Sequence, residues 1–332
     1  MATCMNERDD IQKPTVAIIG AGMAGLTAAN LLKDRFDVTV FDKSRGVGGR
    51  MSTRYADAYE FDHGAQYFTI GNPEFEALIS SLGEGVQPWE SNGLYLKLDG
   101  SELDTGRPRF VGAPRMNTVA KTMAKGLCIK IGRRVTDIGG GEGRYTLSFE
   151  EGPSAGRFEH LICTAPAPQS AALLSAGSPL QEILDQVRMR ACFALMVGLE
   201  VSVDLDWDSL RVEEGPVSWI ALNSSKPGRD PDHTTLVIHA SPDWSDDHKE
   251  HDRDNVQAAL LSRASELCGI ELENAGHIAL HRWLYAYADE GVGDDYLVDP
   301  ESGIILAGDW CLGGRVEGAF LSGRAAARAL LR

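Results

Sequence analysis

The sequence predicts an α/β protein with two parts, a discontinuous domain on a parallel sheet and a second α+β lobe with a mostly antiparallel sheet. Three observations predict this class. A β-branched run, Thr15–Ile19, passes directly into a glycine-rich turn and an apolar helix. A second apolar run, Ile304–Ala307, passes into Gly308-Asp309 near the end of the chain. Between them, several segments alternate apolar and polar residues, which is typical of antiparallel strands.

The stretch Thr15–Asp42 has the order of a Rossmann-type dinucleotide-binding unit. The first strand is followed by Gly20-Ala21-Gly22-Met23-Ala24-Gly25, by a helix that includes Leu26–Leu32, and by a strand, Val38–Phe41, that ends on Asp42. A strand, a glycine-rich turn, a helix and an acidic residue at the end of the second strand are the parts that such a fold requires.

Each of these residues has its own predicted task. Gly20 allows a tight turn, Gly22 lets the backbone approach a pyrophosphate, and Gly25 lets the helix lie close to the sheet. The helix N-terminus offers unpaired N–H groups and a positive dipole end to phosphates. Asp42 is expected to accept hydrogen bonds from a ribose diol and to disfavour a 2′-phosphate.

A second glycine-rich loop, Lys43–Met51, follows at once. It indicates a longer cofactor whose pyrophosphate is approached from two sides, with Arg50 as a cation; a flexible surface loop is the alternative. The segment Phe61–Thr69 mixes aromatic and hydrogen-bonding side chains around Gly64, so it is expected to lie against a planar ring system or to be an ordinary strand entry.

The middle of the chain predicts the remaining elements in order. We expect a hairpin at Leu94–Leu98 with a turn at Asp99-Gly100, a helix over Pro114–Ala124 and a strand at Arg144–Phe149. A further apolar strand, His160–Pro166, is stopped by its proline and is expected to return to the parallel sheet. The second lobe is expected to hold strands at Arg190–Val203, Trp219–Leu222, Leu236–Ala240 and His277–Tyr287, with a helix over Asp254–Cys268.

The C-terminal strand ends on Gly308-Asp309, and a helix runs from the following glycines to Arg332. Asp309 can hold a sugar-alcohol hydroxyl, and the helix dipole favours negative charge at its start. Reduced flavin carries negative charge near N1 and O2, so this end fits a flavin better than a nicotinamide. The predicted division is a disordered leader at 1–13, an FAD-binding domain at 14–73, 110–170 and 300–332, and a substrate domain at 74–109 and 171–299.

Composition excludes several classes of function. The chain has 332 residues and a formal charge of −16, which argues against nucleic-acid binding as its main activity. No apolar run approaches the ~20 residues of a membrane span. The N-terminus has no signal-peptide pattern, and six scattered cysteines without a CxxC pair fit reduced thiols, so we expect a cytoplasmic protein with no metal site. An anionic ligand then needs a local cluster of arginines or of backbone N–H groups.

The Gly20–Gly25 turn, the Asp42-Lys43 to Gly49-Arg50 run and Gly308-Asp309 resemble the flavin-containing amine-oxidase superfamily. Within it, the chain is similar to the renalase-like group, especially its bacterial members. The residues that carry this closer resemblance are Phe41–Gly46, Gly64–Phe68, Ser225-Lys226-Pro227, His281–Ala286 and Gly308–Cys311.

This resemblance implies an FAD enzyme that takes a hydride from mis-reduced nicotinamides, the 2- and 6-dihydro isomers of NAD(P), onto flavin N5. The products are NAD(P)⁺ and, with O2, hydrogen peroxide. The implied partners are these small molecules, with no membrane or nucleic acid, and the chain is expected to be a monomer or homodimer. FAD is expected to be non-covalent, because Cys311 follows Trp310 in the renalase-like pattern.

No residue is assigned a catalytic role, because flavin N5 is expected to do the chemistry. The residues expected to bind substrate are Tyr67, Phe68, Thr69, Asn223, His239, Arg282 and Trp283. Those expected to bind the cofactor are Gly20, Gly22, Met23, Ala24, Gly25, Asp42, Lys43, Arg50, Met51, Ala65, Gln66, Val135, Gly308, Asp309, Val316, Glu317 and Ala319.

Several assignments have open alternatives. The aromatic residues Trp283, Tyr285, Tyr287 and Trp310 are candidates for a flat site wall or for the core. His239 and His281 are substrate contacts or structural histidines, and Lys226 lies in a loop. Arg282 meets a substrate phosphate or forms a surface salt bridge. The alternative functions are an amine oxidase or other small-molecule FAD oxidoreductase, a binding protein with a structural FAD, and an NAD-dependent dehydrogenase.

Overall fold

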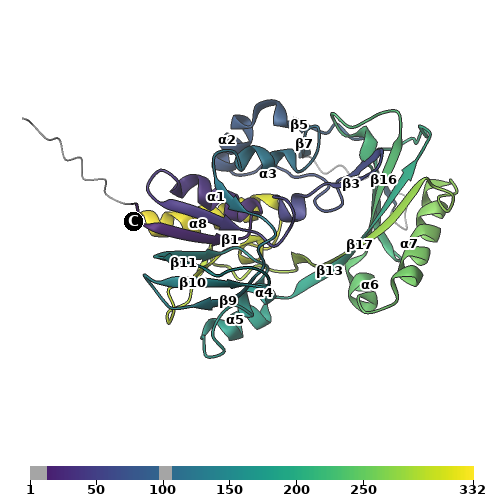
Figure 1. Cartoon of the computed structure of the whole chain (residues 1–332). Coiled ribbons are helices and arrows are strands. Elements are labelled where there is room, and N and C mark those ends of the chain that lie inside the picture. Colours follow the sequence, from purple (N-terminus) through teal and green to yellow (C-terminus); the bar gives the residue numbers. More distant parts are fainter. Residues whose placement is uncertain (1–12, 97–106) are drawn as a thin grey trace, which may run out of the picture.

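A computed structural model describes residues 13–96 and 107–332 of the chain. Residues 1–12 of the expected leader and the expected turn at Asp99-Gly100 lie outside the described residues. The predicted class is confirmed, since a Rossmann-type sheet and a second, mostly antiparallel sheet form the two sides of the molecule in Figure 1.

The first sheet has six strands, with the N-terminal strand near its middle. The order is β18 (Leu297–Val298), β19 (Ile305–Leu306), β12 (His160–Cys163), β1 (Thr15–Ile19), β2 (Asp37–Phe41) and β8 (Cys128–Lys130). All neighbours are parallel except β18 and β19. The predicted return of His160–Cys163 to this sheet is therefore confirmed, and the C-terminal β19 lies beside it.

Alternate residues of β1 face two different layers. Val16 and Ile18 pack with α1 (Met23–Leu32) and α8 (Val316–Leu331), which lie side by side. Ala17 and Ile19 pack on the other face against β10 (Tyr145–Phe149) and α5 (Leu180–Gln186). The antiparallel sheet of β11 (Ala155–Phe158), β10 and β9 (Val135–Gly139) forms that second layer. Burial on both faces explains why β1 reads as a continuous apolar run.

The second sheet also has six strands and lies at the opposite end of Figure 1. Its neighbours are antiparallel except for the last pair, β14 and β6. The order is β17 (His277–Ala288), β13 (Met189–Leu199), β16 (Thr234–Ala240), β15 (Val217–Leu222), β14 (Ser209–Val212) and β6 (Gly93–Leu96). Helix α7 (Arg253–Cys268) covers one face, and α6 (Pro242–His248) packs against β13.

Short elements connect the two sheets. They are β3 (Arg54–Ala56), β4 (Tyr59–Phe61), α2 (Pro73–Ser81), β5 (Val86–Pro88), β7 (Phe110–Gly112), α3 (Thr118–Met123) and α4 (Ala167–Ala171). Helix α2 packs on α8, with the rings of Phe75 and Phe320 5.2 Å apart. The predicted domain boundaries stay a prediction.

The helix predicted over Pro114–Ala124 begins only at Thr118. The residues before it use their N–H groups elsewhere, because Met116 N donates to Asp62 Oδ1 (3.0 Å) and Asn117 N to Thr53 Oγ1 (3.4 Å). These side chains from a distant segment replace the first helical hydrogen bonds, and an apolar periodicity cannot reveal them. In the described part of the chain, no helix has the length and apolar character needed to cross a bilayer.

Candidate functional site

A cavity of about 2070 Å³ lies where residues from both sheets meet. Its lining comes from the turn after β1, the 43–54 and 63–69 segments, β17 and the start of α8. Pockets for one drug-sized ligand reach about 1,000 Å³. The cavity therefore has room for a dinucleotide and a second molecule.

The glycine-rich turn is shaped by close backbone approaches. Gly20 N donates to Phe41 O (2.7 Å), and its φ is +107°, a conformation that side chains disfavour. A Cβ on Gly25 would lie 1.9 Å from Gly20 O, so Gly25 permits the contact between α1 and β1. A Cβ on Gly22 would meet no atom within 4 Å. The backbone at Gly22 is therefore open to a ligand.

Asp42 ends β2 and fixes the neighbouring turns. Its two carboxylate oxygens accept hydrogen bonds from Ala21 N (2.7 Å) and Ser44 N (2.7 Å). The side chain is buried yet lines the cavity. Asp42 can accept further hydrogen bonds from a hydroxyl, because a carboxylate offers about four lone-pair sites.

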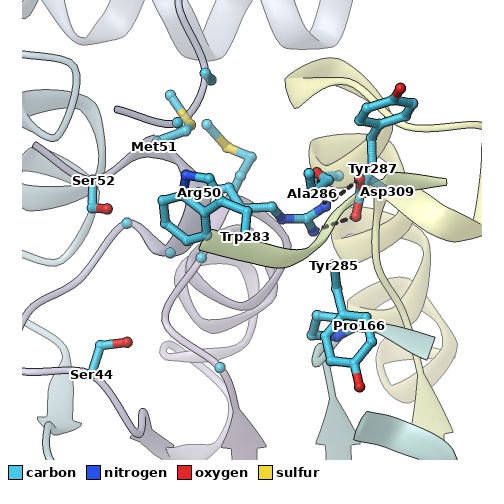
Figure 2. Close-up of a pocket in the computed structure, with 18 of the residues that line it drawn as sticks. Ser44, Arg50, Met51, Ser52, Pro166, Trp283, Tyr285, Ala286, Tyr287 and Asp309 are labelled. Atoms are coloured by element: carbon cyan, nitrogen blue, oxygen red, sulfur yellow. Dashed lines mark hydrogen bonds and ion pairs between the residues drawn. The ribbon is translucent and has the colours of Figure 1, made fainter. Parts of the chain in front are cut away.

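Arg50 joins three distant parts of the chain at the centre of the cavity. Its guanidinium makes a bidentate ion pair with Asp309 (2.5 and 2.8 Å) and donates to Ala286 O of β17 (3.0 Å). Figure 2 shows this pair, with Trp283 beside Arg50 and with Tyr285 and Tyr287 pointing to opposite sides of β17. A bidentate geometry of this kind holds both side chains in a fixed orientation.

The start of α8 is tied to the loop before α2. Glu317 Oε2 accepts hydrogen bonds from Gly71 N (2.6 Å) and Asn72 N (2.9 Å). Arg315, just before the helix, has φ +71°, which is unusual for a side-chain-bearing residue. Both residues line the cavity. These contacts fix the N-terminus of α8 at the cavity, and a helix N-terminus favours negative charge.

The other end of the cavity is aromatic. The rings of His63, Trp283 and His281 contact one another, with centroids 4.3 to 5.0 Å apart, and Trp283 Nε1 donates to His63 O (2.9 Å). Tyr67 and Trp219 form a second pair, 5.7 Å apart. All five side chains line the cavity. Together they present flat surfaces suited to planar ring systems.

Gln66 is held by a buried polar network behind this aromatic end. Lys226 Nζ donates to Gln66 Oε1 and to Asn223 Oδ1, both at 3.1 Å. Gln66 Nε2 donates to Gly64 O (3.0 Å) and to Asp62 O, and lies 3.3 Å from His239 Nε2. These contacts fix the direction in which the Gln66 amide faces the cavity.

Asp62 supplies the charge that balances this network. It is buried, accepts hydrogen bonds from Thr53 Oγ1 (2.7 Å) and Arg229, and lies 3.7 Å from Lys226 Nζ. Burial alone would raise the pKa of Asp62, but the positive charges of Lys226 and Arg229 hold it below its usual value. Burial lowers the pKa of Lys226 to about 7, although Asp62 opposes that change.

The buried histidines make the protein acid-sensitive. Burial lowers the pKa of His63, His239 and His281 to about 4. The unfolded chain binds more protons than the folded one between pH 4 and 6.5, so the free energy of unfolding falls as the pH drops through this window. For His63 alone the loss between pH 7 and 4 is about 3 kcal/mol.

We expect His63→Gln to reduce the acid-induced loss of stability by about 3 kcal/mol relative to the wild-type protein. Urea unfolding at pH 7 and pH 4 measures the difference. The exposed His251 provides the control, since His251→Gln is expected to leave the acid-induced loss unchanged. An equal loss in wild type and His63→Gln would contradict the prediction.

The cavity lining is strongly basic although the chain is acidic. Eleven lysines and arginines line it against three carboxylates, Asp42, Asp309 and Glu317. The basic residues are Lys43, Arg45, Arg50, Arg54, Arg107, Lys121, Arg133, Arg134, Arg211, Arg282 and Arg315. This is the local cluster that an anionic ligand requires on an acidic protein.

The structure brings most of the predicted site residues into one cavity. All residues expected to bind cofactor line it except Gly25, which packs the helix on the strand, and all residues expected to bind substrate line it except Asn223. Asn223 is buried; it donates to Glu60 O (2.9 Å) and accepts a hydrogen bond from Lys226 Nζ, so its side chain belongs to the buried network around Lys226. Trp310 is core, since it is fully buried and donates to Ala165 O (3.0 Å).

Several lining residues were missed from sequence. Arg54, Arg107, Arg211 and Trp219 stand alone between ordinary strand or loop residues, so no motif marks them. Trp219 offered the only signal, an aromatic residue on a strand that precedes a polar loop. Arg211 and Trp219 lie opposite each other because β14 pairs with β15, and this pairing is a tertiary feature that no local motif reveals.

The lining fits a flavin dinucleotide. The backbone at Gly22 is open where a pyrophosphate would approach, and Asp42 lies at the end of β2 where a ribose would bind. At the aromatic end, His63 Nδ1 and Trp219 Nε1 are buried without a hydrogen-bond partner among the described residues. A polar planar group beside them is consistent with these unsatisfied atoms.

Comparison with known families gives two matches. Residues 90–331 match the model of the flavin-containing amine oxidoreductases, and residues 18–82 match an NAD(P)-binding Rossmann-like domain. Among curated relatives, protoporphyrinogen oxidase 2 of Arabidopsis thaliana is 41% identical over 69 residues, 20% of this chain. Phytoene desaturase of Cercospora nicotianae is 43% identical over 77 residues, 23% of this chain. The matched stretches span only 14% and 12% of those proteins.

Solved structures share the fold over nearly the whole chain. An Exiguobacterium sp. 255-15 protein, provisionally assigned as a protoporphyrinogen oxidase, has a TM-score of 0.76 and 14% identity and covers 96% of this chain and 98% of its own. Putrescine oxidase bound to putrescine has a TM-score of 0.67 and 14% identity, covering 96% of this chain and 100% of its own. At this identity the likeness concerns the fold.

Proposed function

Because the chain belongs to the family of flavin-containing amine oxidoreductases, we propose that it is a renalase-like oxidase of mis-reduced nicotinamides. Its substrates would be the 2- and 6-dihydro isomers of NAD(P), and its products NAD(P)⁺ and hydrogen peroxide. The observation that carries this proposal is the basic lining, because a dinucleotide substrate would bring a second pyrophosphate into a cavity that is proposed to hold the pyrophosphate of FAD.

The residues proposed to hold the cofactor are those of the glycine turn, Asp42, Arg50, Gln66 and the start of α8. When bound, FAD supplies the hydride acceptor at N5 and passes the electrons to O2, which becomes hydrogen peroxide. Non-covalent binding is supported by Cys311, which lies outside the cavity lining. Burial raises the pKa of the Cys311 thiol to about 12, so the reactive thiolate is disfavoured.

The chain's own residues bind and orient the substrate. Arg54 and Arg211 come from β3 and β14 and can meet its phosphates at the aromatic end. Arg282 of β17 also lines the cavity, but its Nη1 already donates to Lys249 O and lies 3.9 Å from Glu250 Oε2. Tyr67, Trp219 and Trp283 provide flat surfaces for its ring and exclude water. A dihydropyridine regains aromaticity when it loses hydride, so orientation and desolvation are the main requirements.

Amine oxidation on the same fold is the alternative, and the cavity provides a reason against it. A protonated amine would enter a lining in which basic residues outnumber carboxylates. Lys226 does not line the cavity, and its ammonium is already hydrogen-bonded to Gln66 and Asn223. Like charge at the aromatic end disfavours a cationic substrate.

Anaerobic mixing of the purified, FAD-loaded protein with borohydride-derived dihydro-NAD isomers tests the proposal. We expect rapid bleaching of the flavin absorption by these isomers and none by putrescine or benzylamine. Admission of O2 should restore the colour and yield one hydrogen peroxide per NAD⁺. Bleaching by amines alone would support the alternative, a yellow protein that neither class bleaches would indicate a structural flavin, and a colourless protein that takes up no FAD would indicate an NAD-dependent dehydrogenase.

A further inference from the structure

A guanidinium lies behind one aromatic wall of the cavity. The Arg109 guanidinium carbon is 4.8 Å from the centroid of the Tyr67 ring and 5.6 Å from that of Trp219. Tyr67 and Trp219 line the cavity, whereas Arg109 does not. The guanidinium therefore covers ring surface that the cavity does not reach. We call Tyr67, Trp219 and Arg109 the Arg109 wall.

Neutral side chains hold this guanidinium in place. Arg109 Nη1 donates to Ser91 Oγ (3.0 Å) and to Ser209 Oγ (2.9 Å). Ser91 follows β5, and Ser209 is the first residue of β14. Within residues 13–96 and 107–332, no carboxylate lies at ion-pair distance from it. An arginine keeps its charge in proteins, so a fixed positive charge stands behind the rings.

We propose that Arg109 is a positioning residue that makes the Arg109 wall select neutral rings over cationic ones. The inference rests on the proposed function for its choice of substrate. An aromatic face normally attracts a cation because its quadrupole is negative there. When the Arg109 guanidinium already lies on one face of the ring, a second cation on the opposite face, in the cavity, is repelled by it.

The reaction changes the charge of the ring that would lie on this wall. A dihydropyridine ring is neutral. It loses a hydride, which consists of two electrons and one proton, and so becomes a pyridinium ring with one positive charge. The Arg109 wall therefore accepts the reduced ring and repels the oxidised one, so the same residue favours substrate binding and product release. A protonated amine is rejected for the same reason.

The size of the effect follows from the distance. A ring stacked on the cavity side of Tyr67 would lie roughly 8 Å from the guanidinium carbon. Two unit charges at that separation near a protein surface change an affinity by about thirtyfold without salt and by about tenfold once salt screens them. The repulsion is partly screened by salt, so it should weaken at high ionic strength.

Nicotinamide and 1-methylnicotinamide test this charge selection directly, because the first is neutral at pH 7.5 and the second is a cation. We expect calorimetric titration of the FAD-loaded wild-type protein to give tighter binding of nicotinamide. In Arg109→Met, which keeps an unbranched apolar stem without the guanidinium charge, the ratio of the two dissociation constants should shift by about tenfold toward the cation. NAD⁺ should inhibit the variant more strongly by a similar factor.

Arg109→Lys is the matched control, since it retains the charge and is expected to retain most of the wild-type ratio. A purely packing role predicts instead that both substitutions weaken both ligands alike, and that outcome would overturn the proposal. Preference of the wild-type protein for 1-methylnicotinamide would also overturn it. The ratio is measured without turnover, so a protein that fails to oxidise dihydro-NAD isomers can still show the selection.

Discussion

Gly25→Ala is expected to destabilise the protein by about 3 kcal/mol, the upper end of the usual cost of overpacking. The new Cβ would lie 1.9 Å from Gly20 O and 3.0 Å from Thr164 Oγ1. Only movement of α1 away from β1 can relieve a contact with a backbone oxygen. Chemical denaturation of the apoprotein measures the loss, and FAD uptake should fail with it because the turn is displaced.

Gly22→Ala provides the contrasting result in the same turn. Its Cβ meets no protein atom within 4 Å, and its backbone is extended, so folding should change by no more than about 1 kcal/mol. The Cβ would occupy the space through which a pyrophosphate approaches the backbone. We therefore expect FAD affinity to fall more than about tenfold, which fluorescence titration of apoprotein with FAD measures.

Gly177→Ala is the control for both substitutions, since Gly177 is exposed, away from the cavity, and its Cβ meets nothing within 4 Å. It should alter neither folding nor FAD affinity. If Gly22→Ala binds FAD as tightly as the wild-type protein, the cofactor does not approach this turn. If Gly25→Ala is as stable as Gly177→Ala, the close packing of α1 on β1 does not require a glycine at position 25.

Asp62→Ala is expected to cost about 3–5 kcal/mol, as does the removal of one partner from other buried ion pairs. The substitution leaves Lys226 and Arg229, both buried, without their shared carboxylate, and it removes the acceptor for Thr53 Oγ1 and Met116 N. Gln66 should lose its fixed orientation as well, because Lys226 would no longer be held beside it. Urea denaturation measures the loss.

The control for Asp62 is Glu60, a carboxylate two residues earlier whose ion pair with Arg115 leaves about a third of each side chain exposed. Glu60→Ala should cost less than Asp62→Ala, about 1 kcal/mol, since an ion pair that stays in contact with water contributes little. Because the pKa of Asp62 is lowered in the folded state, its stabilisation is present above the ordinary carboxyl pKa and is lost as the pH falls through the folded value. Equal costs for the two variants would contradict this account.

The sequence predicts the ends of the fold well because they are local patterns. The turn from Gly20 to Gly25 and the acid Asp42 follow from spacing within one unit, and β1, β2 and β12 lie where they were expected. Strand β8 is only three residues long and carries no periodicity, so it was missed. Short edge strands take their structure from the neighbour they pair with, here β2.

The candidate site is only partly predictable, because its distinctive contacts join residues far apart in sequence. Arg50 and Asp309 were each expected at a cofactor, but their ion pair spans 259 positions. Trp310 follows Asp309 directly, yet its side chain lies in the core and donates to Ala165 O. Arg109 carries no motif at all, and its place behind Tyr67 and Trp219 follows from tertiary packing alone.

The packing of α8 on α1 has a consequence for synthesis on the ribosome. The two helices meet so closely that a Cβ on Gly323 would lie 2.2 Å from Ala24 O, and β19 completes the sheet beside β12. Residues 305–331 are translated long after β1, at about 5–20 residues per second. Roughly a quarter of a minute to a minute therefore passes before β19 and α8 can pack on the N-terminal unit. Until then the face of α1 that α8 covers stays exposed, and the cavity lacks the lining that the start of α8 supplies.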